Sequence, residues 1–227
     1  MKDFGYQFQP YAEIDSAKPR PAFRFYRDFS KRVLDFAVAI FLLPLLVPVI
    51  GLFILMIKRD GGPGLYAQER VGLNGKRFQC WKLRTMVQDA ELILEDLCAT
   101  DPLIAREWAK NQKLADDPRI TPIGRFLRAT SLDELPQIFN VLIGDMSFVG
   151  PRPFMTSQEF LYKNAGGQAY FHMRPGITGP WQVSGRNETG FLDRIRFDQM
   201  YLEQQSLPKD LMLMLRTAGV VVRQTGR

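Results

Sequence analysis

The sequence predicts a mostly α-helical protein with one small β-hairpin, an α+β fold that is joined to a membrane segment. Residues 36–57 are all apolar, Pro or Gly, which is long enough for a segment embedded in a bilayer. Residues 65–86 are typical of two strands around an Asn-Gly turn. Several later stretches repeat apolar residues at helical spacing. We therefore divide the 227-residue chain into a polar, aromatic tail (1–30), a membrane helix (31–59) and a cytosolic domain (60–227).

The membrane segment has basic pairs at both ends, at residues 31–32 and 58–59. Basic flanks prefer the cytoplasmic side, so a single pass would leave one pair on the unfavoured side. Pro44 and Pro48 each remove a backbone donor in mid-segment. Together they can bend the helix back so that it re-enters the same side, although a spanning helix with proline kinks is the alternative. Asp35 is expected at the interface beside a basic residue, because its charge is costly in lipid.

Composition limits the chemistry that the cytosolic domain can use. A net charge of +6 and a pI near 9.4 favour a partner that carries phosphate or an anionic membrane surface, and 46% hydrophobic residues suffice for a core. Cys80 and Cys98 match no metal or disulfide spacing, so we expect reduced thiols. His172 is the one histidine, which gives a Ser-His or Cys-His relay little support. Without a Gly-rich phosphate loop, phosphate would be held by arginine, lysine, a helix N-terminus or a metal.

The hairpin and the loops supply basic residues. The hairpin is basic along its length, either as a solvated face or as a face toward phosphate: Arg70, Lys76, Arg77, Lys82 and Arg84. Gly150 and the prolines around Arg152 reduce the entropy lost when that guanidinium is held against a ligand, with a simple proline turn as the alternative. A Gly- and Pro-rich loop over residues 174–187 carries Arg174, Arg186 and a tryptophan, a composition that suits ligand contact.

The remaining elements are expected to be helices. The pattern predicts helices over 88–114, 121–128, 135–143, 154–172 and 191–202. The acidic pair at 116–117 precedes a proline and indicates a turn more than a metal site. The basic, amphipathic stretch at the C-terminal end can lie on a bilayer surface or pack on the core.

Two adjacent carboxylates are the candidate chemistry. Ser131 followed by Glu134 and an apolar run matches a capping box that opens a helix. This would place Asp133 and Glu134 in the first turn, where the helix dipole keeps a carboxylate ionised and able to act as a nucleophile. The alternative is ordinary helix-start chemistry, since the pattern is common. The arginine-rich run before the pair and the braced Arg152 after it favour a function.

The chain resembles the bacterial sugar transferase family, the monotopic phosphoglycosyl transferases, from residue 31 to the C-terminus. The stretches that carry the resemblance keep one order: the apolar segment with Lys31, Arg32, Asp35 and Pro48, then QERVG (68–72), KLRTM (82–86), SLDELPQ (131–137), NVLIGDMS (140–147), VGPRP (149–153) and RPGITG (174–179). The resemblance implies transfer of a sugar 1-phosphate from a UDP-sugar to a polyprenol phosphate such as undecaprenyl phosphate. UMP would be released and magnesium required, at the cytoplasmic face of the bacterial inner membrane, as the first membrane step of exopolysaccharide or other glycan assembly.

The resemblance also implies roles for residues. Asp133 would be the nucleophile that forms an aspartyl phosphosugar, and Glu134 would assist through the metal or by deprotonating the acceptor. Both carboxylates would hold Mg²⁺, and Pro44 with Pro48 would bend a re-entrant helix. The expected substrate and phosphate contacts are Arg152, Arg84, Lys82, Arg70, Arg174 and Arg186.

The sequence departs from the family pattern at three places. Val47 precedes Pro48 where a serine could satisfy a freed carbonyl, Leu83 replaces a usual phenylalanine, and Pro44 is extra. We expect a minimal catalytic form, which can be a homo-oligomer and has no nucleic-acid partner. The alternatives are a non-enzymatic membrane scaffold for glycan assembly and a direct sugar transfer that would release UDP.

Overall fold

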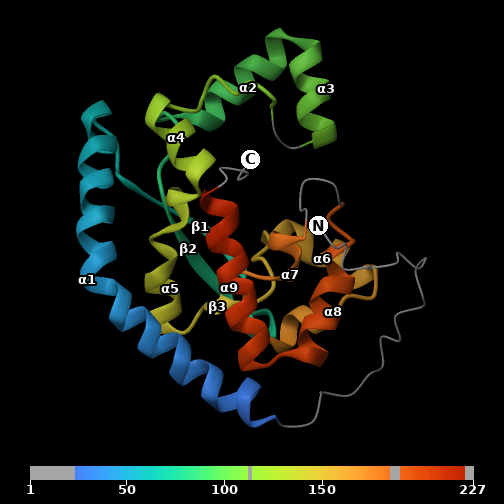
Figure 1. Ribbon diagram of the computed structural model, residues 1–227. Coiled ribbons are helices and arrows are strands. Elements are labelled where there is room, and N and C mark those ends of the chain that lie inside the picture. Colours follow the sequence, from blue (N-terminus) through green and yellow to red (C-terminus); the bar gives the residue numbers. More distant parts are fainter. Residues whose placement is uncertain (1–23, 112–113, 185–189, 223–227) are drawn as a thin grey trace.

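The computed structural model describes residues 24–111, 114–184 and 190–222 (Figure 1). Its helices surround a small antiparallel hairpin, which confirms the predicted α+β class. The helix α1 (Lys31–Ile57) runs along one side of the molecule, and α5 (Gln137–Ile143) packs both on α1 and on the hairpin. The expected tail and the expected ligand residue Arg186 lie wholly or largely outside the described residues.

The helix α1 is long and apolar enough to enter a membrane, and in the described part of the chain no other helix meets that test. Only 11% of its most apolar window is buried by the rest of the protein, so it is not a core helix. Large apolar side chains point away from the domain, among them Phe41, Leu45 and Leu55. The helix stays helical through Pro44 and Pro48 and bends in its middle (Figure 1). The missing proline donors therefore curve the helix without ending it.

The N-terminal end of α1 is bound to the domain by buried charges. Asp35 lies 4.0 Å from Lys31, the expected basic neighbour, and its Oδ1 accepts a bond from the Phe148 N–H at 3.1 Å. Lys31 Nζ lies 2.6 Å from the Asp210 carboxylate, which also accepts from the Tyr201 hydroxyl at 2.7 Å. Asp35 is thus buried against protein, and this end of α1 is held against the C-terminal helices.

The hairpin forms where the sequence predicts it. Strand β1 (Leu65–Val71) pairs antiparallel with β2 (Arg77–Leu83), from Leu65 opposite Leu83 to Val71 opposite Arg77. Asn74 and Gly75 in the turn have φ values of 56° and 77°, the left-handed region that these residue types tolerate. Strand β2 ends at Leu83, earlier than the expected residue 86.

The helices between the hairpin and the acidic pair follow the predicted pattern with one break. The expected helix over 88–114 divides into α2 (Ala90–Thr100) and α3 (Pro102–Asn111), because proline fits only the first turn of a helix. Helix α4 (Pro122–Thr130) begins at Thr121, whose Oγ1 accepts from the Gly124 N–H at 2.9 Å. The acidic residues at 116–117 form the predicted turn, in which Asp117 pairs with Arg119 at 2.6 Å.

A second, parallel strand pair was not predicted. Strand β3 (Ser147–Val149) pairs with β4 (Gly176–Thr178), and α7 (Pro180–Val183) follows, so much of the expected ligand loop at 174–187 is regular structure. Glycines allow the approach: a Cβ on Gly176 would lie 2.1 Å from the Gly150 nitrogen. The expected helix over 154–172 is wrong in its extent, since only α6 (Glu159–Asn164) is α-helical between two 3-10 turns.

The C-terminal helices complete the core. Helices α8 (Arg194–Gln204) and α9 (Leu207–Val222) lie beside β3 and α7. Leu213 of α9 is buried with Tyr201 and Met173, while Leu215 on the same helix is largely exposed. One face of α9 therefore packs on the core, which was one of the two alternatives for this stretch. Another apolar face of α9 is exposed.

Candidate active site

The two carboxylates lie in a short 3-10 turn, Leu132–Glu134, between α4 and α5. The predicted capping box is wrong. Ser131 has a φ of 57° and ends α4, where its N–H donates to the Arg128 carbonyl at 3.2 Å, and its side chain caps nothing. A residue that closes one helix in the left-handed conformation cannot have the extended backbone of an N-cap. Asp133 and Glu134 thus precede α5 and do not lie in its first turn.

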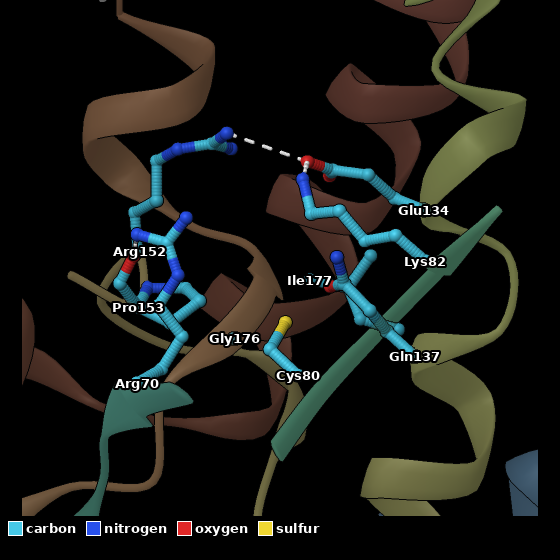
Figure 2. A pocket seen from close by; sticks show the side chains of 9 residues that line it. All are labelled: Arg70, Cys80, Lys82, Glu134, Gln137, Arg152, Pro153, Gly176 and Ile177. Carbon is cyan, nitrogen blue, oxygen red and sulfur yellow. Dashed lines mark hydrogen bonds and ion pairs between the residues drawn. The ribbon is translucent and has the colours of Figure 1, made fainter. Parts of the chain in front are cut away.

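A cleft lies beside this turn, between the hairpin and the loop that follows β3 (Figure 2). Cations and one carboxylate dominate its polar lining. The lining residues are Arg70, Cys80, Lys82, Glu134, Gln137, Arg152, Pro153, Gly176 and Ile177. Three of the expected phosphate ligands, on two strands and one loop, therefore meet at one place in the fold.

Glu134 holds two of the cations in place. Lys82 Nζ lies 2.8 Å from Glu134 Oε1, and Arg152 Nη2 donates to the same oxygen at 3.3 Å. Figure 2 shows both cationic side chains reaching toward this carboxylate from different sides. Asp133 Oδ2 lies 3.9 Å from Lys82 Nζ, so the lysine faces both acids. The group can bind an anion while a carboxylate stays next to it.

The ionisation of Asp133 differs from the expectation. Burial raises the pKa of Asp133 above its ordinary value, Glu134 raises it further, and Lys82, Arg128 and Arg152 act in the opposite direction. The expectation that a helix start keeps Asp133 ionised is wrong, because no such helix start surrounds it. Neighbouring cations now carry that role, since positive charge within a few ångströms favours the carboxylate.

Arg70 forms the inner wall of the cleft. Its Nη1 donates to the Pro153 carbonyl at 3.4 Å and its Nη2 to the Gln68 side chain, whereas its buried Nε has no hydrogen-bond partner within the described chain. Burial lowers the pKa of the Arg70 guanidinium. A buried Nε–H that has no protein acceptor is available to an anion in the cleft.

Two expected phosphate ligands lie elsewhere. Arg84 Nε donates to the Pro63 carbonyl at 2.6 Å and the guanidinium also pairs with Asp60, so it fastens the end of α1 to the hairpin. Arg174 Nε donates to the Gly144 carbonyl at 2.8 Å, at the C-terminal end of α5. Neither lines the cleft. Their charges are used on backbone carbonyls and structural pairs, which charge pattern alone cannot distinguish from ligand contacts.

Sequence reasoning missed Arg194, which supports Arg152 from behind. Arg194 is 3% exposed and donates through Nη2 to the Arg152 carbonyl. Four aromatic rings surround its guanidinium, with centroids 5.1 to 5.8 Å from Cζ: Phe154, Tyr170, Trp181 and Phe191. Asp198, four residues on, lies 3.7 Å from its Nε. That i, i+4 spacing of opposite charges was the signal present in the sequence.

The acidic pair offers two carboxylates that could hold a magnesium ion together with a substrate phosphate. In the part of the chain that the structure describes, no three Asp, Glu, His or Cys side chains gather as a metal cage. Mg²⁺ at phosphate-transfer sites usually takes one or two carboxylates and completes its shell with water and substrate phosphate. Asp133 and Glu134 supply that smaller donor set.

Comparison with known proteins gives the chain its family. The sequence matches the model of the bacterial sugar transferase family over residues 26–224. It is 45% identical over 199 residues to a UDP-galactose-lipid carrier transferase of Erwinia amylovora, covering 87% of this chain and 41% of that protein. The chain thus spans about two fifths of that relative's length.

Two shorter relatives are covered more fully. An exopolysaccharide production protein ExoY of Sinorhizobium fredii is 41% identical over 198 residues, which cover 87% of each chain. A UDP-glucose:undecaprenyl-phosphate glucose-1-phosphate transferase of Caulobacter vibrioides is 40% identical over 227 residues, covering 96% of this chain and 79% of that protein. With a family match over nearly the whole described chain and relatives of this similarity, the protein belongs to the bacterial sugar transferase family.

Proposed function

We propose that the protein is a phosphoglycosyl transferase, which moves a sugar 1-phosphate from a UDP-sugar to undecaprenyl phosphate or a similar polyprenol phosphate and releases UMP. The observation that carries the proposal is the convergence of Glu134, Lys82 and Arg152 at one cleft, with Asp133 3.9 Å from Lys82. The name of the Caulobacter relative, which contains both substrates, supports it. The name of the Sinorhizobium relative supports a role in exopolysaccharide production.

In the first half-reaction, an Asp133 carboxylate oxygen attacks the β-phosphorus of the UDP-sugar. A bond forms between this oxygen and the phosphorus, and the bond from the phosphorus to the bridging oxygen breaks. UMP leaves with that electron pair, and the sugar phosphate remains on the aspartate. Lys82 and Arg152 lie where they can stabilise the charge of the phosphoryl oxygens.

In the second half-reaction, an oxygen of the polyprenol phosphate attacks the same phosphorus. The aspartyl–phosphorus bond breaks, a polyprenol diphosphate sugar is formed, and the Asp133 carboxylate is restored. Glu134 orients both cations through one oxygen and stands beside the nucleophile, where it can accept a proton that the acceptor phosphate still carries. Two displacements with a nucleophile replace one transfer between two phosphates.

Magnesium would be held by Asp133 and Glu134 together with substrate phosphate. When bound, it would neutralise part of the phosphate charge and make the phosphorus more electrophilic. The chain's own contribution is the paired carboxylates and the cations that keep them close.

The membrane arrangement follows from the second substrate. A long polyprenol stays in the bilayer, so the cleft must face the membrane surface. We propose that α1 is re-entrant in the bacterial inner membrane, with both ends and the catalytic domain on the cytoplasmic side. The bend at the prolines and the basic residues at both ends support this.

Cysteine labelling tests this arrangement. In a variant without Cys80 and Cys98, single cysteines replace the exposed residues Asp28 or Arg59. An impermeant thiol reagent should reach both positions only from the cytoplasmic side of membrane vesicles. Labelling of the two positions from opposite sides would instead establish a spanning helix.

Covalent labelling tests the nucleophile. The wild type, incubated with a UDP-sugar labelled in the sugar and without polyprenol, should acquire label and release UMP. Asp133→Asn should do neither, with activity lower by several orders of magnitude, because an amide does not form the phosphoryl intermediate. Its melting temperature should not fall, since burial already disfavours the charge of Asp133.

Two further results would decide against parts of the proposal. If Asp133→Asn still becomes labelled, the nucleophile is another residue. If the wild type transfers sugar but releases UDP, it transfers a bare sugar by direct displacement. Absence of transfer with every UDP-sugar and polyprenol phosphate offered would favour a non-enzymatic scaffold. Glu134→Gln should lower turnover and still permit label uptake if its role lies in the second half-reaction.

A further inference from the structure

The floor of the cleft contains a buried amide that the protein itself does not use. Gln137, the first residue of α5, is 2% exposed and lines the cleft below Lys82 (Figure 2). Within the described chain its carboxamide makes no hydrogen bond to protein. The amide is not among the fully buried side-chain atoms that lack a partner, so it reaches the open cleft, where solvent or a ligand must satisfy it. Its position therefore indicates a ligand.

A second amide on the same helix shows the usual solution. Asn140, three residues further, is fully buried, and its Oδ1 accepts from the Trp81 N–H at 3.0 Å. Its Nδ2 donates to the Gln79 carbonyl at 2.7 Å. The two amides are equally hidden, yet one fastens α5 to β2 while the other opens into the cleft. A buried amide on this helix can therefore be paired with the protein, as Asn140 is, whereas Gln137 is left available in the cleft.

Arg70 supplies a second unused donor in the same cleft. Its Nε is buried and has no partner in the described protein, as noted above. Arg70, Lys82 and Arg152 bring three positive charges to the lining, against the single carboxylate of Glu134. Donors that converge under an excess of positive charge select an anion with several acceptor oxygens. Phosphate is the anion that the proposed substrates carry.

We infer that Gln137 and Arg70 form a subsite for a phosphate ester group, next to the phosphorus that Asp133 attacks. This inference rests on the proposed function for the identity of the ester. Two sources share this chemistry: the phosphate of the departing nucleotide and the phosphate of the polyprenol acceptor. In an in-line displacement the attacking and leaving oxygens lie on opposite sides of phosphorus. The leaving nucleotide and the incoming acceptor consequently both lie opposite Asp133, and one subsite can receive them in turn.

The test uses the isosteric variant Gln137→Met in the full-length protein. Its affinities for UMP, for inorganic phosphate and for a short-chain polyprenyl phosphate are measured by calorimetry in one detergent. We expect binding to weaken by about 10- to 100-fold, the effect of losing a hydrogen bond to a charged group. Gln137→Glu, which keeps the shape and adds a negative charge, should weaken binding further.

The melting temperature without ligand separates a ligand role from a structural one. Gln137→Met should melt at the same or a higher temperature, because the amide that it removes makes no hydrogen bond within the described protein. The matched control Asn140→Leu should melt several degrees lower, because it strands the Trp81 N–H and the Gln79 carbonyl. A lower melting temperature for Gln137→Met with unchanged affinities would overturn the inference and make Gln137 a structural residue.

The ligand arms identify the source of the phosphate. A loss confined to UMP assigns the subsite to the nucleotide, a loss confined to the polyprenyl phosphate assigns it to the acceptor, and a loss of both assigns it to both in turn. If Gln137→Met binds all three probes as the wild type does, the inference is overturned, whatever the melting temperature of the variant. These binding measurements need no turnover. A wild type that transfers no sugar would refute the proposed function, and the binding data would still decide for or against the subsite.

Discussion

Two clusters of arginine and carboxylate meet at Arg152, and they differ in what surrounds them. The Arg152 side chain reaches Glu134, in a cluster with Lys82 and Asp133 that borders an open cleft. The Arg152 carbonyl accepts from Arg194, in a cluster sealed by aromatic rings. The backbone of Arg152 is therefore fixed by Arg194, while its guanidinium faces the cleft.

The two clusters also differ in how their charges are balanced. Asp198 is buried completely, accepts from the Tyr162 hydroxyl at 2.9 Å and lies beside Arg194. Glu134 shares one oxygen between two cations that also face the cleft. Buried pairs contribute little net stability compared with apolar packing, but removing one partner is expensive. The sealed cluster thus fixes a geometry, and the open cluster keeps charge available for a ligand.

The largest effect on this comparison should come from Arg152→Lys. Lysine keeps the charge but cannot make a planar, bidentate contact with phosphate. We expect kcat/KM for the UDP-sugar to fall by about 10- to 100-fold with an unchanged melting temperature, in a UMP-release assay. The control Arg77→Lys alters an ion pair between the start of β2 and Glu159 of α6, outside the cleft. Its kcat/KM should stay within about twofold of the wild-type value. Equal activity of the two variants would make Arg152 a turn residue only.

A smaller effect is expected on the sealed side, from Arg194→Lys. This change removes the donor to the Arg152 carbonyl and the contact with the surrounding rings. It should lower kcat several-fold and destabilise the fold by about 1–3 kcal/mol, because a buried acceptor loses its partner. Tyr162→Phe is the matched control: it removes the hydroxyl bond to Asp198 and leaves the bond to Arg152 intact.

The activities of these two variants separate position from stability. Both should melt at lower temperatures, but only Arg194→Lys should lose activity when assayed well below its melting temperature. If Tyr162→Phe loses as much activity, the sealed cluster acts through stability alone, and the bond to the Arg152 carbonyl has no separate effect.

Local sequence rules predicted the elements that local geometry decides. The Asn-Gly turn, the proline start of α4 and the glycine that ends α5 are each set by a few neighbouring dihedral angles. The side chains of Cys80 and Lys82 share one face of β2 by strand alternation, and both line the cleft. Arg84 breaks the pattern because β2 ends at Leu83.

The errors come from contacts between distant segments. The strands β3 and β4 are three residues each and pair across a separation that no local period records. Ser131 matches a capping box in sequence, but α4 ends there and imposes a left-handed backbone on it. The unpaired amide of Gln137 could not be recognised either, since a glutamine after a proline is ordinary until its partners are known. The arginine-rich and proline-rich segments on either side thus marked the acidic pair as a candidate site, but the backbone conformation around the pair was not predicted.

The smallest expected effect concerns the pH dependence of the sealed cluster. Burial raises the pKa of Asp198 to about 6, above its ordinary value of 3.8, while Arg194 opposes the shift. Between these two values the folded protein binds more protons at this site than the unfolded chain does. The free energy of unfolding therefore falls as the pH rises from about 4 to about 6, by up to roughly 3 kcal/mol at about 1.4 kcal/mol per pKa unit.

This slope can be isolated with Asp198→Asn, by urea unfolding at several pH values in one detergent. The variant should lack the decline between pH 4 and 6, so the free energy of unfolding of the wild type should fall relative to that of the variant across that window, and the difference should stay constant above it. Asp116→Asn, at an exposed position outside both clusters, should keep the wild-type slope. If Asp198→Asn keeps the decline as well, Asp198 is ionised throughout. The sealed cluster would then be an intact ion pair with Arg194 at every pH tested, and it would resemble the open cluster in charge and differ only in access.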